Sequence, residues 1–88
     1  MADPSIQVSL LFFAKSRELT GVSSCQIQIP SHCTFRQLLG NILEQYPSLT
    51  VISESIILSL NEEYLSSDSI IEAHEGDEIA VIPPISGG

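Results

Sequence analysis

The chain has 88 residues, of which 43% are hydrophobic and 16% are charged. This composition excludes a disordered acidic segment, and the length leaves room for one hydrophobic core. Three basic residues against eleven acidic ones give a formal net charge of -8, which disfavours binding to nucleic acid or to an anionic membrane surface. We therefore expect one folded domain whose function lies on one surface or at one end.

The start of the chain and its cysteines carry no targeting, disulfide or metal signal. No basic stretch lies between Met1 and Ser5, and no apolar run is long enough to span a bilayer, so we expect a cytosolic protein. Cys25 and Cys33 lack CxxC spacing, and His32 beside Cys33 does not match a usual zinc spacing. Both cysteines are interpreted as reduced packing residues, and no metal site is predicted.

The first predicted element is a strand over residues 6–13, because apolar side chains occupy every second position. One side of this strand is apolar throughout: Ile6, Val8, Leu10 and Phe12. The other side begins polar and turns apolar at Leu11 and Phe13, so its later half is expected to face something other than water. The polar segment 14–24 that follows is interpreted as a loop.

A second strand over residues 25–29, ended by Pro30, is expected to pair with the first. The best-marked helix then begins, because Thr34 and Gln37 fit a capping box and apolar residues recur at helical spacing up to Pro47. Gly40 inside this helix costs about 1 kcal/mol relative to alanine. Packing of the apolar stripe against a sheet is therefore expected to hold the helix.

The remaining predicted elements are a third strand over residues 56–60, a short edge strand at Tyr64 and Leu65, and a last strand over residues 79–82. This order indicates an α+β fold with one mixed sheet and one helix on one face, and the ubiquitin-like β-grasp fold is the natural candidate. We assign residues 1–82 to this domain and residues 83–88 to a tail. If the helix covers the apolar side of the first strand, Phe13 and Ile82 form an apolar patch on the uncovered face near the tail.

The tail is expected to project from the domain, because Pro83 and Pro84 cannot extend the sheet. Gly87 and Gly88 lack Cβ atoms, so this end of the chain can enter a channel too narrow for other residues. The Gly88 carboxylate is ionised at neutral pH and is a poor electrophile, so another enzyme must activate it. Adenylation by ATP followed by attack of a sulfur nucleophile would leave a thiocarboxylate. A frayed terminus without function is the alternative.

Catalysis by the chain alone is not predicted. The carboxylate pairs Glu62-Glu63 and Asp77-Glu78 lie on strands or turns, where neighbouring side chains point to opposite faces, and no nucleophile accompanies them. They are interpreted as turn and surface residues, and His74 as a surface residue. The sequence offers no cluster of acid, base and nucleophile that would form an active site.

Two sequence blocks, LFFAKSRELTG at residues 11–21 and GDEIAVIPPISGG at residues 76–88, resemble the small subunit of molybdopterin synthase. This family of ubiquitin-like proteins carries sulfur in molybdenum cofactor biosynthesis. The Pro-Pro pair before the glycines distinguishes it from the similar carrier of the thiamine pathway. The resemblance extends loosely over the whole chain.

The resemblance implies a β-grasp fold and a sulfur chemistry centred on Gly88, which is preceded by Gly87, a residue without a side chain. A ubiquitin-activating-like enzyme would form the glycyl adenylate, and a sulfurtransferase would convert it to the thiocarboxylate, a 1-thioglycine. The tail would then enter the large, catalytic subunit, where two carriers convert cyclic pyranopterin monophosphate into the molybdopterin dithiolene. The family assembly is a heterotetramer, and the small subunit binds no cofactor of its own.

The family's docking positions fall here on Phe13, Tyr64 and Ile82. The tail residues that would enter the partner are Pro83, Pro84, Ile85 and Ser86. Arg17 resembles a family position near the partner, with Lys15 close by, although a solvated loop charge is an equal alternative.

Two other functions are compatible with the sequence. A ubiquitin-like protein modifier would join Gly88 to lysines of target proteins through an isopeptide bond. A plain interaction domain would make no use of the tail, and removal of Gly88 would then change nothing.

Overall fold

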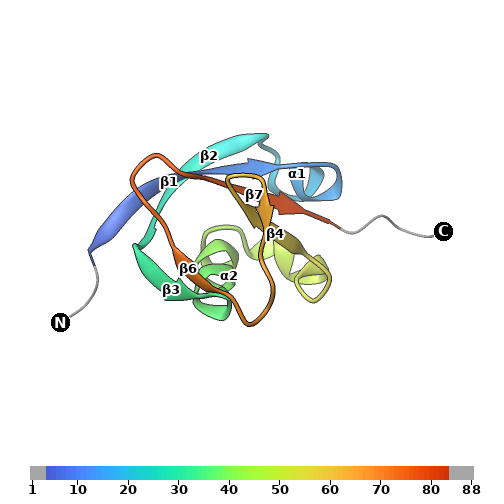
Figure 1. Cartoon of the computed structure of the whole chain (residues 1–88). Coiled ribbons are helices and arrows are strands. Elements are labelled where there is room, and N and C mark those ends of the chain that lie inside the picture. The colour runs from blue at the N-terminus through green and yellow to red at the C-terminus, as the bar shows by residue number, and fades with distance from the viewer. Residues whose placement is uncertain (1–3, 84–88) are drawn as a thin grey trace.

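A five-stranded mixed sheet with one long helix packed on one face forms the body of the molecule (Figure 1). The computed structural model describes residues 4–83, so the predicted tail residues 84–88 lie outside the described range. The elements follow in the order β1 (Ser5–Phe12), α1 (Lys15–Thr20), β2 (Ser24–Pro30), β3 (His32–Thr34), α2 (Phe35–Gln45), the 3-10 helix η1 (Pro47–Ile52), β4 (Ile57–Leu60), β5 (Glu63–Tyr64), β6 (Ile70–Glu72) and β7 (Glu78–Ile82).

The main sheet has the strand order β2-β1-β7-β4-β5. β1 and β7, the first and last strands, are parallel neighbours at its centre, and every other pair in this sheet is antiparallel. β3 and β6 form a separate two-stranded sheet. The predicted α+β fold with a mixed sheet and one main helix is confirmed.

Helix α2 begins where the sequence predicts. The Gln37 backbone N–H donates to Thr34 Oγ1 at 3.1 Å, and the Thr34 N–H donates to Gln37 Oε1 at 2.9 Å. This reciprocal capping box satisfies two backbone donors that a helix start otherwise leaves unpaired. Leu38 and Ile42, one turn apart, are fully buried and dock the helix against the sheet.

The core lies between α2 and the inner face of the sheet. The three central strands contribute alternate side chains that are all fully buried: Val8, Leu10, Phe12, Leu58, Ile79 and Val81. Phe12 also meets the Tyr46 ring edge to face, with ring centroids 5.0 Å apart. The prediction that α2 covers the apolar side of the first strand is thereby confirmed.

Several short elements differ from the sequence-based expectation. Segment 14–24, interpreted as a loop, contains α1, a six-residue helix that ends at Gly21 in the left-handed conformation. β3, β6 and η1 were not predicted at all. These elements are three to six residues long and show no sustained periodicity, so their formation depends on tertiary hydrogen bonds such as the one from Ala73 N–H to the Ser31 carbonyl at 2.8 Å. The predicted edge strand at Tyr64 is β5, shifted by one residue.

Cys25 and Cys33 are not joined in a disulfide. Cys33 is buried and Cys25 is half-buried, so both pack in the fold as expected. The pKa of Tyr46 is raised above its ordinary value, mainly by a side-chain hydrogen bond with Cys25 and to a lesser extent by burial. Within residues 4–83, no helix is long and apolar enough to cross a membrane.

Candidate functional site

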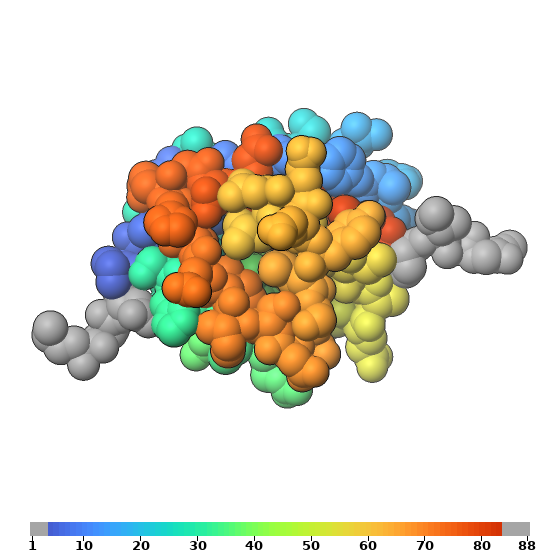
Figure 2. All heavy atoms as spheres, viewed as in Figure 1, coloured from blue at the N-terminus to red at the C-terminus, as the bar shows by residue number. Residues whose placement is uncertain are grey.

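The candidate site is built around the end of β7, where the chain continues into the predicted tail. Figure 2 shows this end, in red, between α1 in blue and the yellow-green region that contains η1. The Ser48 hydroxyl of η1 donates to the Leu19 carbonyl of α1 at 2.8 Å, which ties the two helices together beside the strand. Ile82 and Pro83, the last described residues before the tail, are half-buried.

Ser16, the second residue of α1, connects the ends of the two parallel strands. Its side chain is fully buried, and its hydroxyl oxygen accepts from the Phe13 N–H at 2.9 Å. The same oxygen lies 2.7 Å from the Phe13 carbonyl and 3.0 Å from the Val81 carbonyl, the two acceptors available to its proton. One buried hydroxyl therefore connects the segment after β1 to β7 just before the tail.

The turn that places Ser16 contains an unusual backbone conformation. Ala14 has φ 52° and ψ -124°, a region that favours glycine. The Ser16 N–H donates to the Phe13 carbonyl at 3.1 Å, so residues 13–16 form a tight turn with Ala14 at its second position. A non-glycine residue in such a conformation costs about 1–3 kcal/mol and persists only where the surrounding contacts hold it.

The uncovered face of the sheet is apolar at the tail end. Strand register places Leu11 beside Ala80, Ala80 beside Ser59, and Ser59 beside Tyr64. In the next row across the sheet, Ile57 pairs with Ile82. Phe13 belongs to the same row, because Phe12 pairs with Val81 and Phe13 and Ile82 are the next residues of these two parallel strands. The exposed fractions are 46% for Phe13, 39% for Ile57 and 77% for Tyr64. We call this set the docking face: Leu11, Phe13, Ile57, Tyr64, Ala80 and Ile82.

The other half of the same face is polar. Ser9 lies beside Gln26 on one side and Glu78 on the other, and Gln7 pairs with Gln28. The side chains of Gln7 and Gln26 are hydrogen-bonded to each other. The apolar side chains are therefore concentrated where the tail begins, which is the arrangement expected of a surface that binds a partner.

The structure brings together most of the described residues that the sequence singled out. Phe13 and Ile82 lie in one row of the docking face, Tyr64 lies in the row beside it, and Pro83 continues from Ile82. Ile57 was missed, because its exposure depends on the register of β4 against β7. The predicted site residues Pro84, Ile85, Ser86, Gly87 and Gly88 lie outside the described residues.

Two of the chain's three basic residues lie near this site. Lys15 and Arg17 are exposed on α1, which begins directly after Phe13, whereas Arg36 lies on α2. In a chain with a net charge of -8, this places positive charge beside an otherwise apolar surface. Both side chains are exposed.

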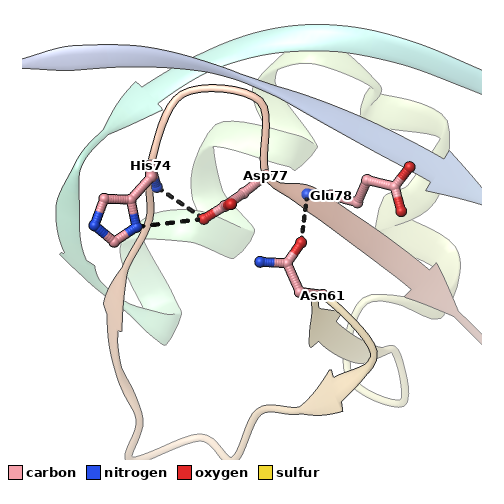
Figure 3. Close-up of polar contacts among 4 residues, drawn as sticks. All are labelled: Asn61, His74, Asp77 and Glu78. Carbon is pink, nitrogen blue, oxygen red and sulfur yellow. Dashed lines mark hydrogen bonds and ion pairs between the residues drawn. The ribbon is translucent and has the colours of Figure 1, made fainter.

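The opposite end of β7 is held by polar contacts (Figure 3). The His74 N–H donates to the Asp77 carboxylate at 2.8 Å, and this bond is the main cause that lowers the pKa of Asp77. The Glu78 N–H donates to Asn61 Oδ1 at 3.0 Å, and the Asn61 N–H donates to the Glu78 carbonyl at 2.8 Å. The Asp77 carboxylate thus has a structural contact in the turn, whereas Glu78 begins β7 and is held through its backbone, and His74 is exposed as expected.

One surface groove lies away from this site, against α2. Its lining residues are Phe35, Arg36, Leu39 and Ser67. This set contains no carboxylate, histidine or cysteine, and it includes none of the site residues that the sequence singled out.

Comparison with known proteins agrees with this geometry. Residues 10–88 match the model of the ThiS family. The chain is 44% identical to the molybdopterin synthase sulfur carrier subunit of Arabidopsis thaliana, over 96% of this chain and 85% of that protein. It is also 44% identical to the protein of the same name from Homo sapiens, over 97% of this chain and 98% of that protein.

Solved structures share the fold at lower sequence identity. SAMP1 from Haloferax volcanii is similar with a TM-score of 0.75 and 22% identity, over 93% of this chain and 99% of that chain. A chain from the complex of subunits 1 and 2 of the molybdopterin-converting factor from Helicobacter pylori has a TM-score of 0.66 and 20% identity, over 94% of this chain and 100% of that chain. These neighbours confirm the β-grasp fold. The family match and the curated relatives establish that the chain belongs to the ThiS family, among the molybdopterin synthase sulfur carrier subunits.

Proposed function

We propose that this chain is the sulfur carrier subunit of a molybdopterin synthase and that Gly88 bears the sulfur. The observation that carries the proposal is the 44% identity to sulfur carrier subunits over nearly the whole chain. The apolar docking face at the root of the tail supports it, because a carrier must seat its domain on a partner while the tail reaches a reaction centre. The chain itself supplies the carried group, and its partners supply the catalysis.

The chemistry of the cycle follows from the carboxylate. ATP would convert the Gly88 carboxylate into an acyl adenylate with release of pyrophosphate. Hydrosulfide, or its equivalent from a sulfur donor, would displace AMP and leave a thiocarboxylate, with one proton released. The thiocarboxylate sulfur would then attack a substrate carbon and displace an oxygen substituent from it, and the displaced oxygen leaves with the bonding electrons and takes up a proton. Water cleaves the acyl carbon–sulfur bond, returning the Gly88 carboxylate and leaving the sulfur on the substrate.

The proposed substrate is cyclic pyranopterin monophosphate, and the product is the molybdopterin dithiolene. Each product needs two sulfur atoms, so two loaded carriers are consumed for each dithiolene. This stoichiometry fits the proposed heterotetramer, in which two copies of this chain flank a dimer of the large subunit. We place the reaction in the cytosol, as the sequence predicts.

The proposed partner for the docking face is the large synthase subunit. Phe13, Ile57 and Tyr64 expose apolar area that a partner would remove from water. The likeness to a chain from the complex of subunits 1 and 2 of the Helicobacter pylori factor supports a partner of this kind. Arg17 and Lys15 are proposed to meet acidic groups of the large subunit or of the activating adenylyltransferase.

Reconstitution with a shortened tail tests the proposal. We expect removal of Gly88 to abolish dithiolene formation with the large subunit and the activating enzyme, while binding to the large subunit persists through the docking face. Removal of residues 1–3, at the other end of the chain, serves as the control and should leave product formation intact. Full product formation by the chain without Gly88 would refute the proposed function.

A protein modifier joined to lysines requires the same activated Gly88, so the β-grasp fold alone does not separate the two functions. The curated relatives favour the carrier. Recovery of lysine-linked adducts from cells, together with normal molybdoenzyme activity after deletion of the gene, would instead establish the modifier.

A further inference from the structure

We propose that Ser16 is a positioning residue for sulfur transfer, because its buried hydroxyl fixes the root of the tail relative to the docking face. This inference rests on the proposed function, since it concerns how the loaded tail reaches its substrate. Ser16 does not touch the reacting atoms. It acts through Val81, which precedes the tail, and through Phe13, which belongs to the docking face.

Ser16 lies where the parallel ladder of β1 and β7 ends. β1 and β7 pair up to Phe12 and Val81. Beyond that pair, the direct bond from the Phe13 N–H to the Val81 carbonyl is long, at 3.4 Å. The Ser16 hydroxyl fills this position, because it accepts from the Phe13 N–H at 2.9 Å and lies 3.0 Å from the Val81 carbonyl. It adds two shorter contacts beside the long direct bond.

This hydroxyl is buried. Ser16 is 0% exposed, so water does not compete for its contacts. The hydroxyl carries one proton, and both the Phe13 carbonyl at 2.7 Å and the Val81 carbonyl at 3.0 Å lie within reach of it, so the two carbonyls meet at one buried donor. The Val81 carbonyl therefore lies against the same buried hydroxyl as Phe13, immediately before Ile82 and Pro83, from which the tail continues.

The backbone next to Ser16 is strained. Ala14 adopts φ 52°, which an alanine rarely does, and the tight turn at residues 13–16 brings the Ser16 hydroxyl back to the strand ends. Backbone strain of this kind recurs at functional sites, where geometry is maintained at the expense of stability. Through Ser16, the turn thereby connects Phe13, an exposed residue of the docking face, to Val81, which precedes the tail.

The functional consequence follows from the length of the tail. Seven residues follow Val81 up to and including Gly88, which in an extended chain is a reach of about 23 Å. A small rotation at the root would move the sulfur by much more than the same rotation moves the docking face. Group transfer is sensitive to displacements of about 1 Å, whereas the apolar contacts of the face tolerate them.

Two variants test the proposal. Ser16→Ala removes the hydroxyl that spans the two strands. Thr20→Val removes a hydroxyl from the same helix whose contacts stay local, to the Ser16 carbonyl at 3.0 Å and the Val22 carbonyl at 3.1 Å. Both proteins would be loaded to the thiocarboxylate, confirmed by mass, and mixed with saturating large subunit. The measurements are the dissociation constant and the single-turnover rate of sulfur transfer.

We expect Ser16→Ala to lower the single-turnover rate about fivefold to tenfold, the factor that one hydrogen bond typically carries. Its dissociation constant should stay within about twofold of the parent chain, because the apolar face is intact. Thr20→Val should leave both quantities unchanged. An unchanged transfer rate in Ser16→Ala, or an equal loss in Thr20→Val, would overturn the positioning role.

A further variant covers the case in which Ser16→Ala does not fold. Ser16→Cys fills nearly the same space with a weaker donor, and in this buried position the thiol is inert. It should lower the transfer rate in the same direction, and an unchanged rate in this folded variant would also overturn the role. The parent chain separates the two hypotheses: if the loaded parent transfers no sulfur, the proposed function fails, whereas normal transfer by every variant refutes only the inference about Ser16.

Discussion

Truncation of Phe13 tests whether the docking face binds the large subunit. A fully buried aromatic side chain removes about 150–250 Å² from water, so the 46% of Phe13 that is exposed corresponds to roughly 70–115 Å². At about 25 cal/mol per Å², covering this area stabilises a complex by about 2 kcal/mol. Phe13→Ala is therefore expected to raise the dissociation constant about thirtyfold. Titration calorimetry with the large subunit would measure it.

The matched control is Ile70→Ala. Ile70 is 60% exposed but lies on β6 in the two-stranded sheet, outside the docking face. Its truncation should leave the dissociation constant within about twofold, the change usual for a residue outside an interface. Thermal unfolding of both variants checks that each is folded at the assay temperature. Equal effects of the two truncations, or an unchanged constant in Phe13→Ala, would refute the placement of the interface.

Three further predictions concern the fold that supports the site. Ala14→Gly should raise the free energy of unfolding by about 1 kcal/mol, because glycine adopts the positive φ without strain, and a lower urea midpoint would contradict this. The folded-state pKa of Asp77 is lowered, so its stabilising contribution is present above about pH 4 and is lost as the pH falls through the folded-state pKa. Urea unfolding from about pH 6 to pH 3 should therefore show a smaller decrease in the free energy of unfolding for Asp77→Asn than for the parent chain. An equal decrease in the two proteins would argue against the role of this carboxylate. Leu10→Ala, at a fully buried core position, should lower the free energy of unfolding by about 3 kcal/mol, and a loss below about 1 kcal/mol would indicate a looser core.

The longer elements could be predicted from the sequence because their patterns are local. The capping box at Thr34 and the helical spacing after it marked α2, and period-two alternation marked β1 and β7. The same alternation placed Phe13 and Ile82 on the face opposite the core. Phe13 and Ile82 are distant in the sequence, but their shared patch could be predicted, because the alternation within each strand shows which side chains face the core and which face away from it.

Other features depend on contacts that no local pattern records. α1 has only six residues, and its Ser16 reaches a carbonyl on Val81, 65 positions along the chain. Ile57 belongs to the docking face only because β4 pairs with β7 in a register that sets Ile57 beside Ile82. Alternation around Ile57 shows apolar residues on both sides of the strand, so the sequence did not indicate which of them is exposed.

The central claim is that the Gly88 carboxylate is loaded with sulfur. Intact-mass measurement of the protein purified from its own cells tests it most directly, with fragmentation to locate any change. We expect a population in which one oxygen of the Gly88 carboxylate is replaced by sulfur, and we expect this population to increase when the large subunit is absent. A chain end that stays an unmodified carboxylate under those conditions, or that is found only in amide linkage to lysines of other proteins, would contradict the account.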